Sequence, residues 1–374
     1  MKYIEDFRNG DYAKLLIKNI VAKADTHRHY QFMEFCGGHT HTIHRYGLPH
    51  LLPPNVEMIH GPGCPVCVLP IARIDKAIAL VNYPKVILCS YGDMLRVPGS
   101  SQKSLLKAKA QGADVRMVYS VDDALRIAKK NPQNEIVFFA IGFETTTPPT
   151  AHVIMQAKKL GLKNFSVFCN HVLTPAAMEA LLRFQEAEPT HVTTLDGFVG
   201  PAHVSIIVGS QAYQTVGKKY QKPIVIAGFE PLDVLHAILM LINQVNEKRY
   251  DVEIQYTRAV SEKGNLISQQ TIAEVLELRS NFEWRGLGWI PNSALKIKKK
   301  YAEFDAENRF ELPESTEEEH KQCQCGSVLR GIKKPIECKL FAKVCTPENP
   351  LGSCMVSSEG ACAAVFAYGR VNHL

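Results

Sequence analysis

Two cysteine motifs near the amino terminus contain residues suited to metal or redox chemistry. The first is CGGHTH at residues 36–41, which places Cys36, His39 and His41 close together, and His44 follows. Thiolates and imidazoles are the soft and borderline ligands that bind iron, zinc or copper. Two glycines allow the backbone to turn sharply and approach a bound group. We therefore expect a binding site here; the alternative is a buried cysteine beside solvated histidines.

The second motif is GPGCPVC at residues 61–67, with Cys64 and Cys67. A Cys-x-x-Cys between a strand and a helix is typical of thiol–disulfide proteins, because helix N-terminal amides stabilise a thiolate. Two such sulfurs can close one disulfide and so exchange two electrons. Pro70 separates them from the next helical pattern. We expect a redox dithiol; half of a metal site and a structural role are the alternatives.

A third polar segment is GFETTTPP at residues 142–149, in which Glu144 supplies a carboxylate. Its threonines and prolines could equally cap a helix. The chain has no GxxxxGK[ST] and no GxGxxG after a strand, so a nucleotide-hydrolysing enzyme is not supported. His171 and His203 are further candidates, and we expect both to be packed side chains rather than ligands.

The carboxyl-terminal segment is rich in cysteine. It holds six of the eleven cysteines: Cys323, Cys325, Cys338, Cys345, Cys354 and Cys362. Structural zinc usually takes its four thiolates from two tight Cys-x(2–4)-Cys pairs. The wide, irregular spacings here favour a [4Fe–4S] cluster, which needs four thiolates converging on one point. No Cys-x3-Cys-x2-Cys is present, so radical S-adenosylmethionine chemistry is not indicated.

Short apolar segments that alternate with helical patterns must position these residues. The expected strands are 31–35, 56–59, 86–89, 115–119, 136–141, 165–169, 206–208 and 224–227. The expected helices are 71–80, 104–111, 122–129, 150–160, 175–184 and 232–245. Near-continuously apolar strands separated by helices predict an α/β fold with parallel sheets covered on both faces. One large or two smaller sheets are possible, and the similar strand ends at 141–144 and 227–230 favour two.

Residues 251–315 alternate less clearly. We expect a strand at 253–260, a helix at 271–278, an irregular loop at 284–291 and an acidic linker at 317–319. A turn at 131–133 is a plausible boundary between two halves.

The composition excludes several classes of protein. With 374 residues, 46% hydrophobic and 21% charged, the chain is not a disordered, fibrous or disulfide miniprotein. The net charge of +6 is spread out except at Lys296–Lys300, which we interpret as a solvated strand end rather than a nucleic-acid site. The charged start and the absence of a run of ~18 apolar residues predict a cytoplasmic protein without a membrane partner.

Five motifs in this order resemble the hydrogenase maturation factor HypD family over nearly the whole chain. They lie at residues 35–41, 61–67, 142–146, 323–326 and 354–362. The resemblance implies two similar parallel α/β domains facing a cleft and a small iron–sulfur domain. We expect residues 1–130 to form the first domain, 131–250 the second, and 251–374 a return segment with the [4Fe–4S] domain.

The resemblance also implies a function. HypD-like proteins are scaffolds for assembly of the Fe(CN)2CO unit of [NiFe]-hydrogenase, in complex with HypC and with HypE as the source of cyanide. Cys36 would hold the iron with His39 and His41 beside it. Cys64 and Cys67 would exchange electrons in a cleft that Glu144 lines. The implied cluster ligands are Cys325, Cys338, Cys345 and Cys362, leaving Cys323 and Cys354 as non-ligands.

Two other functions are compatible with the same residues. The chain could be an iron–sulfur reductase that uses Cys64 and Cys67 on a protein or small-molecule disulfide. It could also be a zinc-stabilised interaction module without redox chemistry. We expect a metallocofactor maturation and redox protein rather than a stand-alone turnover enzyme.

Overall fold

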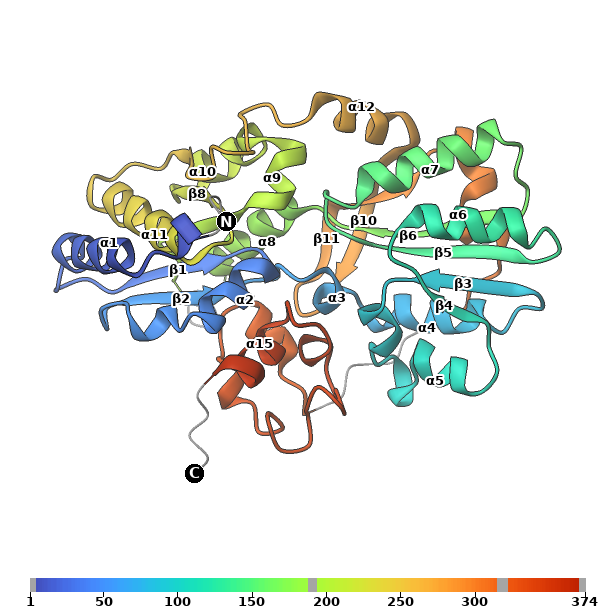
Figure 1. Cartoon of the computed structure of the whole chain (residues 1–374), viewed down its shortest axis with the longest axis horizontal. Coiled ribbons are helices and arrows are strands. Elements are labelled where there is room, and N and C mark those ends of the chain that lie inside the picture. Colours follow the sequence, from blue (N-terminus) through green and yellow to red (C-terminus); the bar gives the residue numbers. More distant parts are fainter. Residues whose placement is uncertain (1–4, 188–193, 315–321, 370–374) are drawn as a thin grey trace.

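Two parallel β-sheets form the centre of the computed structural model, which describes residues 5–187, 194–314 and 322–369 (Figure 1). Sheet A has the strand order β2-β1-β7-β8-β9 and sheet B the order β4-β3-β5-β6, with parallel pairing throughout. Their bounds are β1 Tyr30–Glu34, β2 Val56–His60, β3 Val86–Ser90, β4 Val115–Met117, β5 Glu135–Gly142, β6 Phe165–His171, β7 Gly197–Pro201, β8 Ile224–Ala227 and β9 Val252–Ile254. The expected α/β fold with parallel sheets is confirmed.

Helices cover both sheets and bury their apolar faces. On sheet A, α1 and α11 pack against each other and enclose one core with β1 and β8; on sheet B, α6 and α7 enclose another with β5 and β6. Ser120 begins α6 with a capping box, in which it and Asp123 satisfy each other's backbone amides. The main helices are α1 Gly10–Lys23, α2 Gly37–Arg45, α3 Pro65–Val68, α4 Ile71–Leu80, α5 Leu105–Ala110, α6 Val121–Lys130, α7 Thr147–Lys159, α8 Thr174–Ala187, α9 Ala202–Val208, α10 Gln214–Tyr220, α11 Pro231–Asn246, α12 Leu266–Val275 and α13 Ala306–Arg309.

Several predicted elements are wrong. The expected strand at 206–208 belongs to α9, and the strand lies upstream as β7. β7 reads GFVGP, and because glycine and proline are depleted in strands its pattern is hidden. The expected strand at 253–260 shortens to β9. The expected helix at 271–278 is α12, which ends at Val275, and the following residues belong to a strand.

An antiparallel hairpin replaces the irregular loop predicted at 284–291. Its strands are β10 (Leu276–Trp284) and β11 (Gly288–Ile297). The lysine run begins at the end of β11, where Lys296 pairs with Glu277 and Lys300 with Glu274, as expected of a solvated strand end. The predicted linker at 317–319 lies outside the described residues.

The chain passes from sheet A to sheet B and back. β1 and β2 belong to sheet A, β3 to β6 form sheet B, and β7 to β9 complete sheet A. Strand pairing therefore crosses the boundary expected at residue 130, because β3 pairs with both β4 and β5. The turn at 131–133 lies between α6 and β5 of the same sheet unit. Sequence order alone cannot show that β1 pairs with β7, about 160 residues later.

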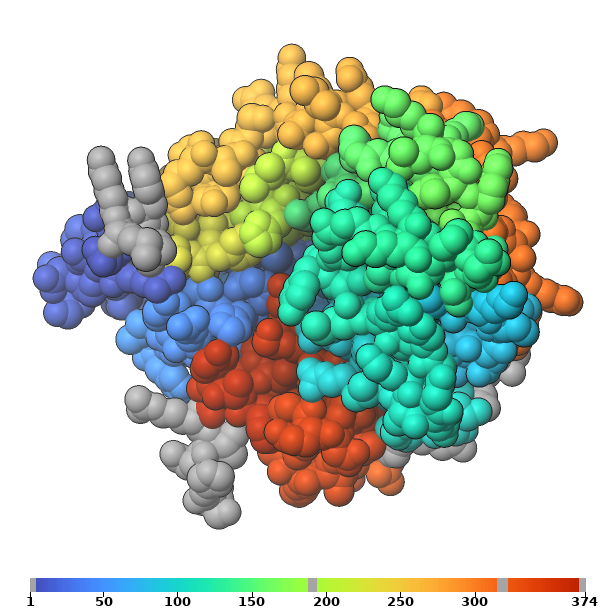
Figure 2. All heavy atoms as spheres, turned by 45° about the vertical axis from the view of Figure 1, so that its right-hand side comes forward, coloured from blue at the N-terminus to red at the C-terminus, as the bar shows by residue number. Residues whose placement is uncertain are grey.

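The carboxyl-terminal residues 322–369 form a module of short helices. These are α14 Cys325–Leu329, the 3₁₀ turns η7 Pro335–Glu337 and η8 Ser353–Met355, and α15 Ala361–Tyr368. In this module, α15 packs on α2 and η8 on α3. Figure 2 shows the red module between the blue amino-terminal segment and the cyan segment of sheet B. No helix within the described ranges is long and apolar enough to cross a membrane.

Candidate functional site

The Cys36 and Cys64 loops lie against each other at the carboxyl ends of β1 and β2. The Gly61 amide donates to the Glu34 carbonyl at 3.0 Å, and the Gly37 amide donates to the Gly63 carbonyl at 3.1 Å. A Cβ on Gly63 would lie 2.6 Å from Cys36 Cα, so only glycine permits this approach. In parallel sheets, ligands bind beyond these strand ends. The structure thus brings together the two motifs that the sequence singled out.

Cys36 precedes the first residue of α2, so the motif predicted as a loop is in fact a strand end joined to a helix. Burial raises the pKa of the Cys36 thiol, and the carboxyl groups of Glu359 and Glu34 add to the effect. The nearby amides of Gly38 and His39 act in the opposite direction without reversing it. Without a bound cation, Cys36 is therefore a neutral thiol.

Cys64, which caps the start of α3, and Cys67 within that helix form a disulfide, with their Cα atoms 5.2 Å apart. Both are buried, at 4% and 0% exposure, and the Cys67 amide donates to Cys64 Sγ at 3.2 Å. The two sulfurs are thus close enough to form a disulfide, and their redox role stays a prediction. Pro70 precedes α4, so α3 and α4 are separate helices and the cysteines lie in the shorter one.

The dithiol contacts two other parts of the chain. The Ser353 hydroxyl of η8 donates to the Cys67 carbonyl at 2.9 Å. At the turn of the β10–β11 hairpin, the Arg285 amide donates to the Val68 carbonyl at 2.7 Å. In the same turn, a Cβ on Gly286 would lie 2.5 Å from Gly326 Cα, beside Cys325. The hairpin turn therefore contacts both the dithiol helix and the cysteine-rich module.

The two histidines of the first motif have different surroundings. His39 is fully buried: its Nε2 lies 3.0 Å from the carbonyls of both Ala227 and Gly228, and burial lowers its pKa. This contact attaches α2 to the end of β8. The His41 ring lies 5.0 Å from the Tyr368 ring of α15. Both histidines are thus used in part to pack α2 against its neighbours.

A buried polar network next to Cys36 was not predicted. The Glu34 carboxylate, fully buried at the end of β1, accepts the Cys36 amide at 2.9 Å and the Thr40 hydroxyl. His60 Nδ1 lies 3.0 Å from the same carboxylate, and His60 Nε2 lies 2.7 Å from His44 Nε2. Burial, with smaller contributions from His60 and His50, lowers the pKa of His44 to about 3. The one sequence feature that could have indicated this network is Glu34, a charged residue within a mostly apolar strand.

Glu144 is almost fully buried beside α8. Its carboxylate accepts the Thr174 amide at 2.9 Å and the Thr174 hydroxyl at 3.1 Å. Burial raises the pKa of Glu144 to about 7. The hydroxyl of Tyr213, itself fully buried, has its pKa raised by burial and also by Glu144 and Cys36. Glu144 and Cys36 therefore both act electrostatically on Tyr213. Sequence reasoning missed Tyr213.

The other two candidate histidines lie at the border of this group: His171 Nδ1 is 3.5 Å from the Thr146 hydroxyl, and His203 shares the Phe229 ring with His39. His171 is buried as expected, with Nε2 2.9 Å from the Thr150 hydroxyl. His203, expected to be packed, is exposed with its ring 4.2 Å from that of Phe229.

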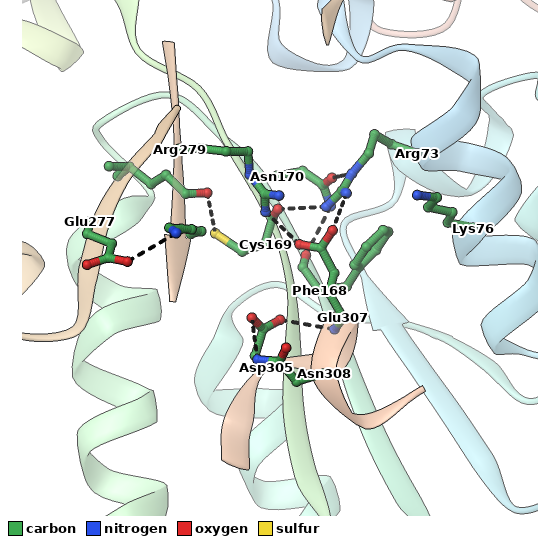
Figure 3. A network of polar contacts seen from close by, with 12 residues as sticks. Arg73, Lys76, Phe168, Cys169, Asn170, Glu277, Arg279, Asp305, Glu307 and Asn308 are labelled. Atoms are coloured by element: carbon green, nitrogen blue, oxygen red, sulfur yellow. Dashed lines mark hydrogen bonds and ion pairs between the residues drawn. The ribbon is translucent and has the colours of Figure 1, made fainter. Parts of the chain in front are cut away.

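A buried ion-pair network attaches α4 to sheet B and to α13 (Figure 3). Arg73, in the first turn of α4, donates to Asn170 Oδ1 at 2.5 Å, Glu307 Oε1 at 2.6 Å and the Cys169 carbonyl at 2.9 Å. Arg279 donates to the other Glu307 oxygen at 2.5 Å. Although burial opposes ionisation, the two arginines lower the pKa of Glu307 to about 2. This network fixes the helix that follows the dithiol.

Cysteines of the carboxyl-terminal module converge on a small apolar cavity. Its lining includes all four cysteines predicted as ligands, together with Cys323: the set is Cys323, Cys325, Cys338, Cys345 and Cys362. Cys354 is fully buried, and its thiol contacts those of Cys325 and Cys362. Gly352 is packed against Cys325 Sγ, where a Cβ would lie 2.6 Å away. Among the described residues, no three His, Cys, Asp or Glu side chains are already arranged around a metal position.

Comparison with known proteins identifies the family. A family model described as "HypD: Hydrogenase formation hypA family" matches residues 11–369. The chain belongs to the HypD family. It is 62% identical over 370 residues to the hydrogenase maturation factor HypD of Azotobacter vinelandii, covering 99% of this chain and 97% of that protein. The corresponding values for HypD of Escherichia coli K12 are 44% over 373 residues, with 98% of each chain covered. The resemblance inferred from five motifs is confirmed.

Membership of the HypD family makes hydrogenase maturation the context of this site. The Cys36 motif meets the dithiol motif through Gly63, and the cysteine-rich module contacts the dithiol through Ser353. Glu34, His60, Tyr213 and the hairpin turn are the additional elements that only the structure reveals.

Proposed function

We propose that this chain is the scaffold on which the Fe(CN)2CO unit of [NiFe]-hydrogenase is assembled. A HypC-like protein would be its partner in the complex and a HypE-like protein would supply cyanide. The observation that carries the proposal is the direct packing of the Cys36 loop on the dithiol loop, with Gly63 against Cys36. A sulfur anchor for iron and a two-electron redox pair are thereby held side by side.

Cys36 is the proposed protein ligand of the iron. Its thiol is neutral because burial and two carboxylates oppose ionisation, so iron must displace the proton to form the Fe–S bond. A soft anionic thiolate suits low-spin iron bearing cyanide and CO. His39 holds the start of α2 through the Ala227 and Gly228 carbonyls, and so orients Cys36. His41, on the same helix, makes an edge-to-face contact with Tyr368 of the carboxyl-terminal module.

Cys64 and Cys67 are the proposed electron-exchange pair. Reduction of their disulfide takes two electrons and two protons and yields two thiols. With its pKa near 7, Glu144 can hold or release a proton around neutrality. Its placement near Cys36, indicated by the shared neighbour Tyr213, supports a role in proton supply.

The cysteine-rich cavity fits a [4Fe–4S] cluster in its donor chemistry. Cys325, Cys338, Cys345 and Cys362 would hold the cluster in an apolar setting that includes Leu340 and Phe341. A bound cluster would supply one-electron redox chemistry beside the dithiol. The chain's own contribution is the Ser353–Cys67 hydrogen bond, which keeps this module against α3.

The alternative of a general disulfide reductase is less well supported. Cys64 and Cys67 are 4% and 0% exposed, so a protein disulfide could not reach them without rearrangement of α3. Steady turnover of a disulfide substrate by the isolated protein would favour that alternative.

Infrared spectroscopy of the protein purified anaerobically with its HypC-like partner tests the scaffold role. Cyanide and CO stretches are expected, and a Cys36→Ala variant should lose them. Cys89→Ala is the matched control, because Cys89 is a buried cysteine of β3 outside the site. Absence of the bands from the wild-type complex, with its iron–sulfur chromophore intact, would refute the proposal.

A further inference from the structure

A cavity of about 610 Å³ lies beside the edge strand of sheet A, apart from the dithiol. Its wall combines β2, the segment around residues 49–54 and residues 331–337 of the carboxyl-terminal module. Three histidines line it, and two of them come from elements next to the cysteine motifs: His44 of α2 and His60 at the end of β2. The next residue after His60 begins the GPGCPVC motif, and His44 belongs to the helix that Cys36 begins.

The two imidazoles face each other through their Nε2 atoms at 2.7 Å, with ring centroids 4.8 Å apart. The other ring nitrogen of His60, Nδ1, lies 3.0 Å from the fully buried Glu34 carboxylate. When His60 donates Nδ1–H to that carboxylate, a neutral ring keeps its lone pair on Nε2. A carboxylate on the far nitrogen is the arrangement that orients metal-binding histidines in proteins.

We propose that His44 and His60 bind a divalent transition-metal ion of the Fe²⁺ class at the wall of this cavity. The proposal rests on the proposed function, because it supplies a first site for the iron that Cys36 later holds. It adds a binding site distinct from both Cys36 and the cysteine-rich module.

Binding requires a small local change. Metal–imidazole bonds of about 2.0–2.1 Å put two ligand nitrogens roughly 3.0–3.4 Å apart, so the Nε2 atoms must separate by a few tenths of an ångström. The two rings must also rotate until both lone pairs point at the ion. The proton in the Nε2–Nε2 contact moves from His44 Nε2 to His44 Nδ1, leaving both imidazoles neutral. Water in the cavity completes the coordination, since no third His, Cys, Asp or Glu among the described residues is arranged as a ligand. Two protein ligands give weak, reversible binding, as suits an ion that is passed on.

Glu34 connects this site to Cys36. One carboxylate oxygen contacts His60 Nδ1, and the other accepts the Cys36 amide at 2.9 Å. The ring that would bind the ion and the backbone of the proposed anchor are therefore positioned by the same side chain.

Cobalt titration tests the site with a spectroscopic readout. Co²⁺ alone is added anaerobically to the cluster-loaded Cys36→Ala variant and followed by visible absorption. We expect one Co²⁺ per chain, with weak ligand-field bands and no sulfur-to-cobalt charge transfer. Adding His44→Phe, which leaves the Glu34–His60 contact in place, should weaken binding by at least about tenfold, and so should adding His60→Phe. His29→Phe, at another histidine lining the cavity, should bind as before.

Equal Co²⁺ affinity in all of these variants, or no stoichiometric binding to the Cys36→Ala variant, would overturn the proposal. Circular dichroism on each variant verifies folding, and His44→Phe alone decides the result if His60→Phe does not fold. The measurement involves neither cyanide nor hydrogenase. Failure of this site is thus distinguishable from failure of the scaffold role, which the infrared bands report.

Discussion

The two buried glutamates near Cys36, Glu34 and Glu144, have different hydrogen-bond partners. Glu34 is hydrogen-bonded to an amide, a hydroxyl and an imidazole, whereas Glu144 accepts the amide and hydroxyl of Thr174 and its own amide. Burial outweighs these donors and raises the pKa of Glu144 to about 7. At the residue scale, Glu144 is thus the group suited to gain or lose a proton near neutral pH.

Stability should decrease with rising pH because of Glu144. Its folded-state pKa of about 7 lies above the ordinary value of 4.5, so between these values the folded state binds more protons than the unfolded state. The free energy of unfolding should fall through this range, by up to about 3 kcal/mol, relative to a Glu144→Gln variant. Urea unfolding at a series of pH values measures it; parallel pH profiles for both proteins would contradict the assignment.

Replacing Cys64 by Ala should separate redox function from cluster assembly. The variant removes the disulfide but none of the proposed cluster ligands. We expect unchanged iron and sulfide content and hydrogenase activity reduced to background in a strain carrying the variant. Normal hydrogenase activity would exclude the dithiol from maturation.

At the scale of elements, short loops rather than long helices determine the site. Gly63 allows the dithiol loop to touch the Cys36 backbone, and Arg73 fastens α4 to β6 and α13. Both contacts join segments that belong to different strand–helix units. The positions of Cys36 and the dithiol therefore depend on backbone packing as much as on the cysteines themselves.

A Gly63→Ala substitution should damage the site. Its Cβ would lie 2.6 Å from both Cys36 Cα and the Phe35 carbonyl carbon, where only backbone could give way. We expect destabilisation of about 1–3 kcal/mol, as for overpacking, and loss of the cyanide and CO infrared bands. Gly10→Ala is the control, since no atom lies within 4 Å of its Cβ position. Wild-type bands and stability in Gly63→Ala would show that the close approach is not needed.

Breaking the Arg73 network should be costly. Arg73→Met leaves the partly buried carboxylate of Glu307 with Arg279 as its remaining arginine partner. The expected loss is about 1–3 kcal/mol, between the values typical of exposed and of fully buried ion pairs. Arg126→Met, in an exposed ion pair on α6, should cost less than about 1 kcal/mol. Denaturant unfolding measures the free energy of unfolding of both variants. Equal decreases for Arg73→Met and Arg126→Met would show that the Arg73 network does not stabilise the fold.

The sequence was informative where the pattern is local. β1, β2 and α4 are apolar segments bounded by clear turn residues, and the motifs at their ends were located correctly. It did not indicate which strands pair, because no residue pattern in β1 or β7 identifies the other as its neighbour. The hydrogen-bond network of Glu34 and the hairpin turn at Arg285 depend on contacts between distant segments, so no local pattern predicts them.

At the scale of the whole molecule, the carboxyl-terminal module is a separate chemical unit held against α2 and α3. All four predicted ligands line its cavity, but so does Cys323, and Cys354 contacts two of them. A cluster bound in this module would therefore have six cysteines from which to draw four thiolates.

Substitution of single cysteines should identify the ligands. Cys345→Ser and Cys338→Ser should lose most iron and sulfide together with the iron–sulfur chromophore, since a cluster needs four thiolates. Cys323→Ser and Cys354→Ser should retain both. Iron and sulfide analysis after anaerobic purification measures this; zinc in place of iron in the wild type would instead support a structural zinc site.

The order in which the strands leave the ribosome has a consequence for the cysteines. β1 and β2 are synthesised early, but their neighbour β7 follows about 160 residues later. At roughly 5–20 residues per second, sheet A waits on the order of ten to thirty seconds for completion. Throughout that interval Cys36, Cys64 and Cys67 have no finished sheet to enclose them. The strand order thus leaves these three thiols open to reaction until the later strands are made.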